Sequence, residues 1–107
     1  MITGKQKRYL KAQAHSMRPV FQIGKEGLTD EWFEQVGHAL EKRELLKVNV
    51  LQGAMLEAKE AAAAITANSE ITVVQVIGHV LVLYRQAQDP KNRQISTSLQ
   101  KITQHKR

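Results

Sequence analysis

Apolar positions along the chain recur at two different spacings, and the spacing changes from segment to segment. After Thr29 they fall four residues apart, and Trp32, Val36 and Leu40 share one face, which is typical of an amphipathic helix. Thr29 is a favourable N-cap, and two acidic residues in the first turn lie at the positive end of the helix dipole. The pattern predicts a helix that begins after Thr29 and buries one face.

Four shorter segments have the alternating or β-branched composition of strands. They span residues 20–23, 45–51, 72–77 and 80–85. Gly78 and His79 separate the last two segments, which favours a hairpin with a two-residue turn in which Gly78 supplies a positive φ. We therefore expect four strands, the last two of them antiparallel.

Two more helices complete the predicted order. Thr3 can cap a helix that starts near Gly4 and ends before Arg18, because the residue before Pro19 avoids the helical region. The alanine-rich segment 55–67 predicts a helix that lies close to a sheet. The order α-β-α-β-α-β-β predicts a single α/β domain, in which helices pack on a four-stranded mixed sheet.

Length and composition limit the possible classes of protein. The 107 residues, 42% of them hydrophobic, fit one domain at residues 1–86 followed by a basic C-terminal tail at 87–107. Ile95, Leu99 and Ile102 are the docking points that we expect in this tail. Because the chain has no cysteine, no secretory signal and no apolar run that could span a bilayer, we expect a cytoplasmic protein without disulfides or membrane contact.

The residue types that carry catalysis or bind metals are scattered. His15, His38, His79 and His105 fall in different segments without a ligand spacing, and no serine lies in a G-x-S-x-G context. Pairs of carboxylates occur three apart on predicted helix surfaces, which is ordinary for a solvated face. We expect no enzyme activity, no metal, no cofactor and no small-molecule substrate, and we expect a monomer.

Charge is segregated along the chain, which has a net charge of +6. Residues 1–25 carry six Lys or Arg and no acid, residues 26–70 carry nine acids and four bases, and residues 71–107 carry six bases and one acid. Like charges held together repel one another unless a polyanion offsets them. This distribution favours a nucleic-acid partner, although a solvated surface with uneven charge explains it as well.

A short glycine motif follows the first predicted strand. Gly24 and Gly27 enclose Lys25 and Glu26 just before the capped helix, so the backbone can approach another chain closely and Lys25 supplies a mobile cation. This is how a G-x-x-G loop clamps nucleic-acid phosphates. A plain strand-to-helix turn is the alternative, and Glu26 must point away from a phosphate. Among the few aromatic residues, Tyr84 is the best candidate to stack on a base.

Several linked motifs resemble one known family. They are Thr3–Gln6 at the start of the first helix, Ala14–His15 followed by Arg18–Val20, Ile23–Thr29, Glu44–Val48, and Gln75–Gly78 followed by Leu81–Arg85. In this order they resemble the CRM domain (chloroplast RNA splicing and ribosome maturation), in its stand-alone bacterial, YhbY-like form. The resemblance covers residues 3 to 85, and His79 departs from the Lys or Arg that relatives usually carry there, so a cation at that turn depends on pH.

The resemblance implies an RNA-binding fold similar to the C-terminal domain of a translation initiation factor. It also implies association with precursor large ribosomal subunits during ribosome assembly, and plant relatives assist group II intron splicing. Carried over to this chain, the RNA surface consists of the loop Gly24, Lys25, Glu26 and Gly27, the helix cations Lys5, Lys7, Arg8 and Lys11, and the flanking residues Arg18 and Arg85. We expect the helix cations to converge with the loop on one binding surface.

Two other classes of function are open on the sequence. A protein-interaction adapter would use the acidic face of the second helix, formed by Glu31, Glu34 and Glu41, and its basic ends would be incidental. Duplex DNA binding is the other alternative, but no recognition helix with base-reading side chains at groove spacing is evident.

Overall fold

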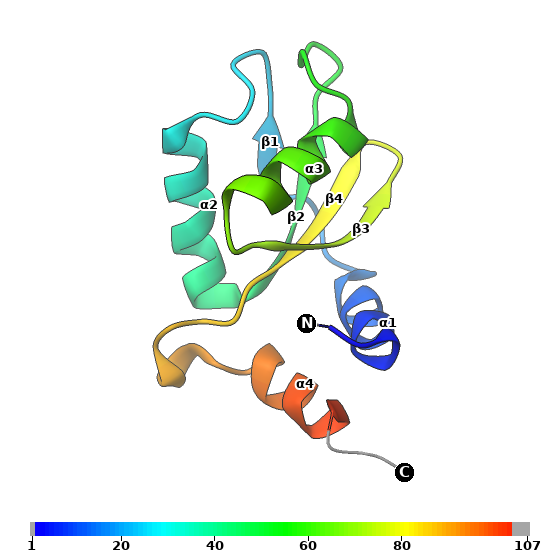
Figure 1. Cartoon of the computed structure of the whole chain (residues 1–107), viewed down its shortest axis with the longest axis vertical. Helices are drawn as coiled ribbons and strands as arrows, with labels where there is room; N and C mark the ends of the chain where they lie inside the picture. Colours follow the sequence, from blue (N-terminus) through cyan, green and yellow to red (C-terminus); the bar gives the residue numbers. More distant parts are fainter. Residues whose placement is uncertain (1, 104–107) are drawn as a thin grey trace.

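The computed structural model describes residues 2–103 as a four-stranded sheet with helices on both of its faces (Figure 1). The elements are α1 (Gly4–Ala14), β1 (Phe21–Ile23), α2 (Asp30–Arg43), β2 (Leu45–Val50), α3 (Ala58–Asn68), β3 (Thr72–Ile77), β4 (Val80–Tyr84), the 3-10 turn η1 (Pro90–Asn92) and α4 (Ile95–Thr103). The predicted fold class and order α-β-α-β-α-β-β are confirmed, and η1 and α4 are added after them.

The sheet is mixed, with the strand order β1-β2-β4-β3. β1 and β2 are parallel and are joined through α2, while β4 is antiparallel to both of its neighbours. The β3–β4 hairpin turns at Gly78, whose φ of 58° is the positive value predicted for it. The pairing of β3 with β4 shifts register between Val73 and Gln75, and Val73 and Val74 pack in different cores.

Each face of the sheet has its own hydrophobic core. α2 and α3 cover one face, where Val36, Leu40 and Ile65 pack on Leu46 and Leu83. α1 and α4 cover part of the other face. There the buried cluster consists of Leu10, Ala14, Leu45, Val74, Val82, Tyr84 and Leu99. Because neighbouring strand residues point to opposite faces, Leu45 and Leu46 serve different cores.

The helix α2 follows the predicted pattern closely. The Thr29 hydroxyl accepts a hydrogen bond from the Trp32 backbone N–H at 3.0 Å, so it caps the helix. Val36 and Leu40 are fully buried, and Trp32 is 9% exposed. The Trp32 indole N–H also donates to the Gln22 carbonyl at 2.9 Å, which ties the start of α2 to β1.

Two helix limits differ from the prediction. α1 ends at Ala14 rather than just before Arg18, and the Lys47 ammonium lies near the end of this helix, where it donates to the Met17 carbonyl at 3.1 Å. α3 starts at Ala58 rather than at Met55. Glu57 and Glu60 form a capping box at this start, so the preceding residues 51–57 remain a loop.

The segment after β4 is more ordered than the tail that the sequence predicts, because residues 87–103 pack on the domain. We call residues 86–94, between β4 and α4, the strap. In α4, Leu99 is 6% exposed and packs in the core that contains Leu10. The Gln6 side chain also donates to the Leu99 carbonyl at 3.1 Å. Residues 104–107 of the predicted tail, including His105, lie outside the described residues.

Glu44 fastens this segment to the domain. Its carboxylate is fully buried and accepts hydrogen bonds from the backbone N–H groups of Ala87, Gln94 and Ser96, and from the Ser96 hydroxyl, at 2.6 to 3.0 Å. Burial raises the pKa of Glu44, but these hydrogen bonds outweigh it, so the pKa lies below its ordinary value. Glu41 adds a second anchor, since it accepts from the N–H groups of Gln88 and Asp89, which lower its pKa.

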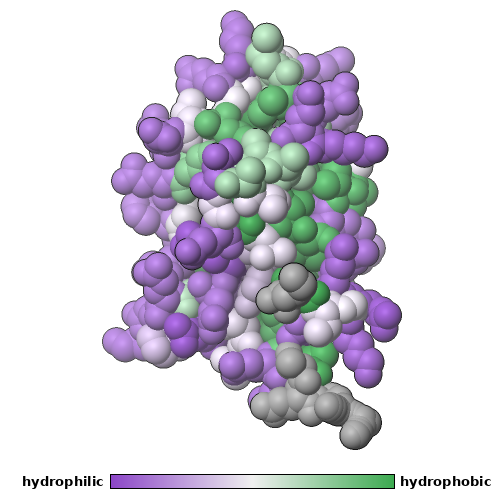
Figure 2. Space-filling model, in the orientation of Figure 1, coloured by the Kyte–Doolittle hydropathy of each residue, from purple (hydrophilic) through white to green (hydrophobic). Residues whose placement is uncertain are grey.

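The surface over α3 is less polar than the flanks of the molecule. Figure 2 shows hydrophobic and weakly polar side chains over α3 and hydrophilic side chains on either side of it. Between residues 2 and 103, no helix has the length and apolar character needed to cross a membrane.

Candidate nucleic-acid interface

The G-x-x-G motif forms a turn at the end of β1. The Gly27 N–H donates to the Gly24 carbonyl at 3.0 Å and closes the turn. Gly27 has a φ of 73°, a conformation that strains any residue with a Cβ atom. A Cβ atom on Gly27 would meet nothing within 4 Å, so backbone conformation and not crowding requires glycine at this position.

The turn lies beside an open hollow of about 400 Å³. Lys25 and Glu26 are exposed at its rim, and the first turn of α2 supplies Glu31. Three carboxylates, those of Glu26, Asp30 and Glu31, therefore stand near one ammonium in this stretch of chain. The loop permits a close backbone approach, but its own charge does not attract a polyanion, so the attraction must come from other parts of the surface.

The helix α1 supplies part of that attraction. Lys5, Lys7 and Arg8 are exposed, and Lys11 is half-buried beside His15 and Lys47 at the edge of a second hollow. The buried positions Gln6, Leu10 and Ala14 are four apart and face the sheet. As predicted, the polar face of this helix is cationic.

The expectation that these cations converge with the glycine loop is wrong. α1 packs on Leu45 and Tyr84, at the end of the sheet where β2 begins and β4 ends. The loop follows Ile23, which pairs with Val50 at the other end of β2. Figure 1 accordingly shows the β1–α2 loop at the upper end of the molecule and α1 in the lower half. The length of a strand separates two sites that the sequence predicts as one.

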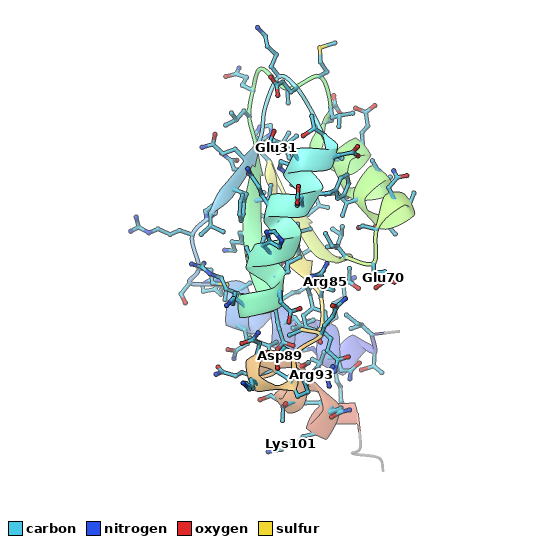
Figure 3. The ribbon with its side chains drawn as sticks, turned by 90° about the vertical axis from the view of Figure 1, so that its left-hand side faces the viewer. Glu31, Glu70, Arg85, Asp89, Arg93 and Lys101 are labelled. Carbon is cyan, nitrogen blue, oxygen red and sulfur yellow. The ribbon has the colours of Figure 1, made fainter. Side chains whose placement is uncertain are left out.

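The two flanking arginines also lie apart. Arg18 is exposed and lines a cleft with Lys42 and Arg43, two cations from the end of α2 that no sequence motif singles out. Arg85 is half-buried and donates to the Gly37 carbonyl at 3.0 Å. Figure 3 shows Arg85 beside the lower part of α2, whereas Glu31 marks the start of this helix near the loop.

Tyr84 is not available to stack on a base. It is 8% exposed and lies in the core with Leu10, Val74 and Leu99. Burial, followed by the nearby charge of Glu44, raises the pKa of Tyr84. The prediction is wrong because the last residue of a strand can face either core, and sequence position alone does not show which face is covered.

The acidic face of α2 and a metal site are the remaining features that the sequence analysis considered. Of the acidic face on α2, Glu41 is already bound to the strap, which leaves Glu31 and Glu34 for a partner. Within residues 2–103, no group of three or more His, Asp or Glu residues could hold a metal ion.

A family model identifies the class of protein. The model of the CRS1 / YhbY (CRM) domain matches residues 2–85, which includes the loop, both crossover helices and all four strands. This chain therefore belongs to the CRM domain family, as its linked motifs predicted. The strap and α4 lie beyond the matched residues.

Named relatives cover most of the chain. This chain is 44% identical over 91 residues to the "Probable RNA-binding protein YqeI" of Bacillus subtilis, and the match covers 85% of this chain and 95% of the relative. It is 41% identical over 91 residues to an "RNA-binding protein" of Haemophilus influenzae, covering 84% and 91%. The solution structure of the hypothetical protein SAV1595 from Staphylococcus aureus matches with a TM-score of 0.70 and 44% identity, over 88% of this chain and 98% of that one.

Proposed function

We propose that this protein binds RNA, that the cations of α1 and the G-x-x-G loop contact its phosphates, and that the RNA belongs to precursors of the large ribosomal subunit. Membership of the CRM family and the names of its relatives support RNA as the partner. The ribosomal target rests on the family resemblance alone.

The turn at Gly24–Gly27 is the observation that carries this proposal. It presents an exposed Lys25 on a backbone without side-chain bulk at either glycine, and α2 begins just beyond it. Phosphates bind well to backbone N–H groups in such a position, while Lys5, Lys7 and Arg8 supply long-range attraction. Because the two regions lie at different ends of the sheet, an RNA that touches both must run along the length of the molecule.

A titration with labelled single-stranded RNA at several salt concentrations tests RNA binding. Replacing Lys5, Lys7, Arg8 and Lys11 with Gln should lower the slope of log affinity against log salt by about 0.7 for each phosphate that the variant no longer neutralises. The control is Lys59→Gln with Lys101→Gln, two exposed cations outside the proposed surface. A wild-type protein that binds RNA no better at low salt than at high salt would contradict the proposal.

Gradient fractionation of a cell lysate tests the ribosomal target separately. We expect the protein to sediment with precursor large subunits at low salt and to leave them at high salt. Sedimentation with free protein alone at low salt would remove the ribosomal part of the proposal and leave RNA binding intact.

A further inference from the structure

A cleft of about 480 Å³ lies where the ends of several elements meet. Arg18 comes from the connection between α1 and β1, while Lys42 and Arg43 come from the last turn of α2. All three side chains are exposed, and within the described residues no carboxylate lines the cleft. The fold thus gathers three cations from two distant parts of the sequence around one concave surface.

The floor of the cleft is apolar, and its remaining wall consists of uncharged polar side chains. Met17, Val20 and Ile95 contribute apolar surface, and Val20 is 45% exposed. Asn92 and Gln94 form the wall on the strap side. A bare phosphate would leave the apolar floor in contact with water, whereas a phosphate that carries a nucleoside would also cover it.

We propose that this cleft binds one nucleotide of an RNA strand, with its phosphate held by Arg18, Lys42 and Arg43 and its nucleoside lying on the apolar floor. This inference rests on the proposed RNA binding and adds two cations, Lys42 and Arg43, to the predicted site residues. It also gives the strap a role in binding, although the strap lies outside the matched CRM domain.

The wall formed by the strap is held in place by α2 and the residue that follows it. The Gln94 N–H donates to Glu44 at 3.0 Å, and Glu41 holds the N–H groups of Gln88 and Asp89. The carboxylates near the cleft are therefore turned toward backbone donors, and the cations face the solvent. This arrangement favours an anion at the cleft mouth.

Lys42 and Arg43 also have a simpler explanation, because cations in the last turn of a helix complement the negative end of its dipole. Arg18 is not part of α2, so this explanation does not cover it. RNA affinity and its salt dependence separate the two roles, since a dipole effect changes stability and leaves RNA binding unchanged.

The test compares the triple variant Arg18→Gln, Lys42→Gln, Arg43→Gln with the control Lys59→Gln, Lys101→Gln. With single-stranded RNA, the triple variant should lower the salt slope by about 0.7, which corresponds to the one phosphate held in the cleft, while the control should leave the slope nearly unchanged. Val20→Ser should weaken binding about threefold without changing the slope, because it removes apolar surface and no charge.

Controls distinguish the possible failures. Far-ultraviolet circular dichroism and thermal unfolding establish that each variant is folded, which we expect because all five charged side chains are exposed. If the wild-type protein binds no RNA, the proposed function itself fails. If the wild-type protein binds RNA and the triple variant keeps the affinity and the salt slope of the control, the cleft proposal is overturned and RNA binding stands.

Discussion

Replacing Glu44 with Gln should detach the strap and destabilise the whole domain. The buried carboxylate accepts four hydrogen bonds, and Gln would offer one oxygen and one NH₂ group in its place. The amide would therefore face N–H donors as another donor. Each buried donor left without an acceptor costs about 1–3 kcal/mol, so losing two of the four partners would remove a large part of the about 5–15 kcal/mol by which domains are stable.

The backbone at Glu44 supplies a matched pair of variants. Its φ is 66°, which strains a residue with a Cβ atom by about 1–2 kcal/mol and does not strain glycine. Glu44→Ala and Glu44→Gly both remove the carboxylate, so Glu44→Gly should be the more stable of the two by about 1 kcal/mol. This difference isolates the conformational strain from the loss of hydrogen bonds.

Urea unfolding followed by fluorescence measures both effects, because Trp32 is the single tryptophan and its side chain packs in the core from the first turn of α2. The pH dependence gives a second readout. The folded pKa of Glu44 lies below its ordinary value of 4.5, so its contribution to stability is present above about pH 4.5 and is lost as the pH falls through the folded pKa. Glu44→Gln should therefore lose less stability than the wild type as the pH falls below about 4.5. A cost under about 1 kcal/mol, with an unchanged acid dependence, would refute this reasoning.

Other substitutions test separate features. Gly27→Ala should cost about 1–2 kcal/mol of stability, because Gly27 has a positive φ. Gly24→Ala should leave stability unchanged. Equal thermal unfolding temperatures of the two variants would contradict this difference. Gly37→Ala should raise stability by about 0.5–1 kcal/mol in urea unfolding, because Ala loses less conformational freedom than Gly inside α2 and its Cβ atom would fit 3.5 Å from the flexible end of Arg85. Lys47→Met should cost about 1 kcal/mol by removing donors from the carbonyl groups after α1, and amide exchange near Ala14 should rise if this is correct.

Elements with strong local patterns were predictable from the sequence. Periodic apolar positions and the Thr29 cap place α2 within a residue of its observed start, and Thr3 does the same for α1, where it forms a capping box with Gln6. The helix limits that were predicted wrongly have different causes. α3 starts late because Glu57 and Glu60 cap each other, and alanines at 61–64 carry no boundary signal. Ile95 and Leu99 were expected as docking points, but the helix α4 that carries them was not predicted, and it packs with Leu10 of α1.

The candidate site was predictable residue by residue but not as an arrangement. The cationic helix and the glycine turn were recognisable, since each is encoded in a short segment. Their separation was not, because it depends on which end of the sheet α1 packs against. Lys42 and Arg43 were missed for the same reason: they are ordinary last-turn cations until the fold brings Arg18 beside them.

The acidic middle of the sequence explains why so much positive charge is left facing outward. Among its carboxylates, those of Glu41, Glu44 and Glu60 accept hydrogen bonds from backbone N–H groups, at the strap or at the start of α3. Such a carboxylate satisfies a donor that would otherwise be unpaired, and this binds it more firmly than an exposed ion pair would. These three acids therefore stabilise the strap and a helix start, and they do not cover exposed cations such as Arg18 and Lys42. If RNA neutralises them, its binding should raise the thermal stability of the protein at low salt and have little effect on it at high salt.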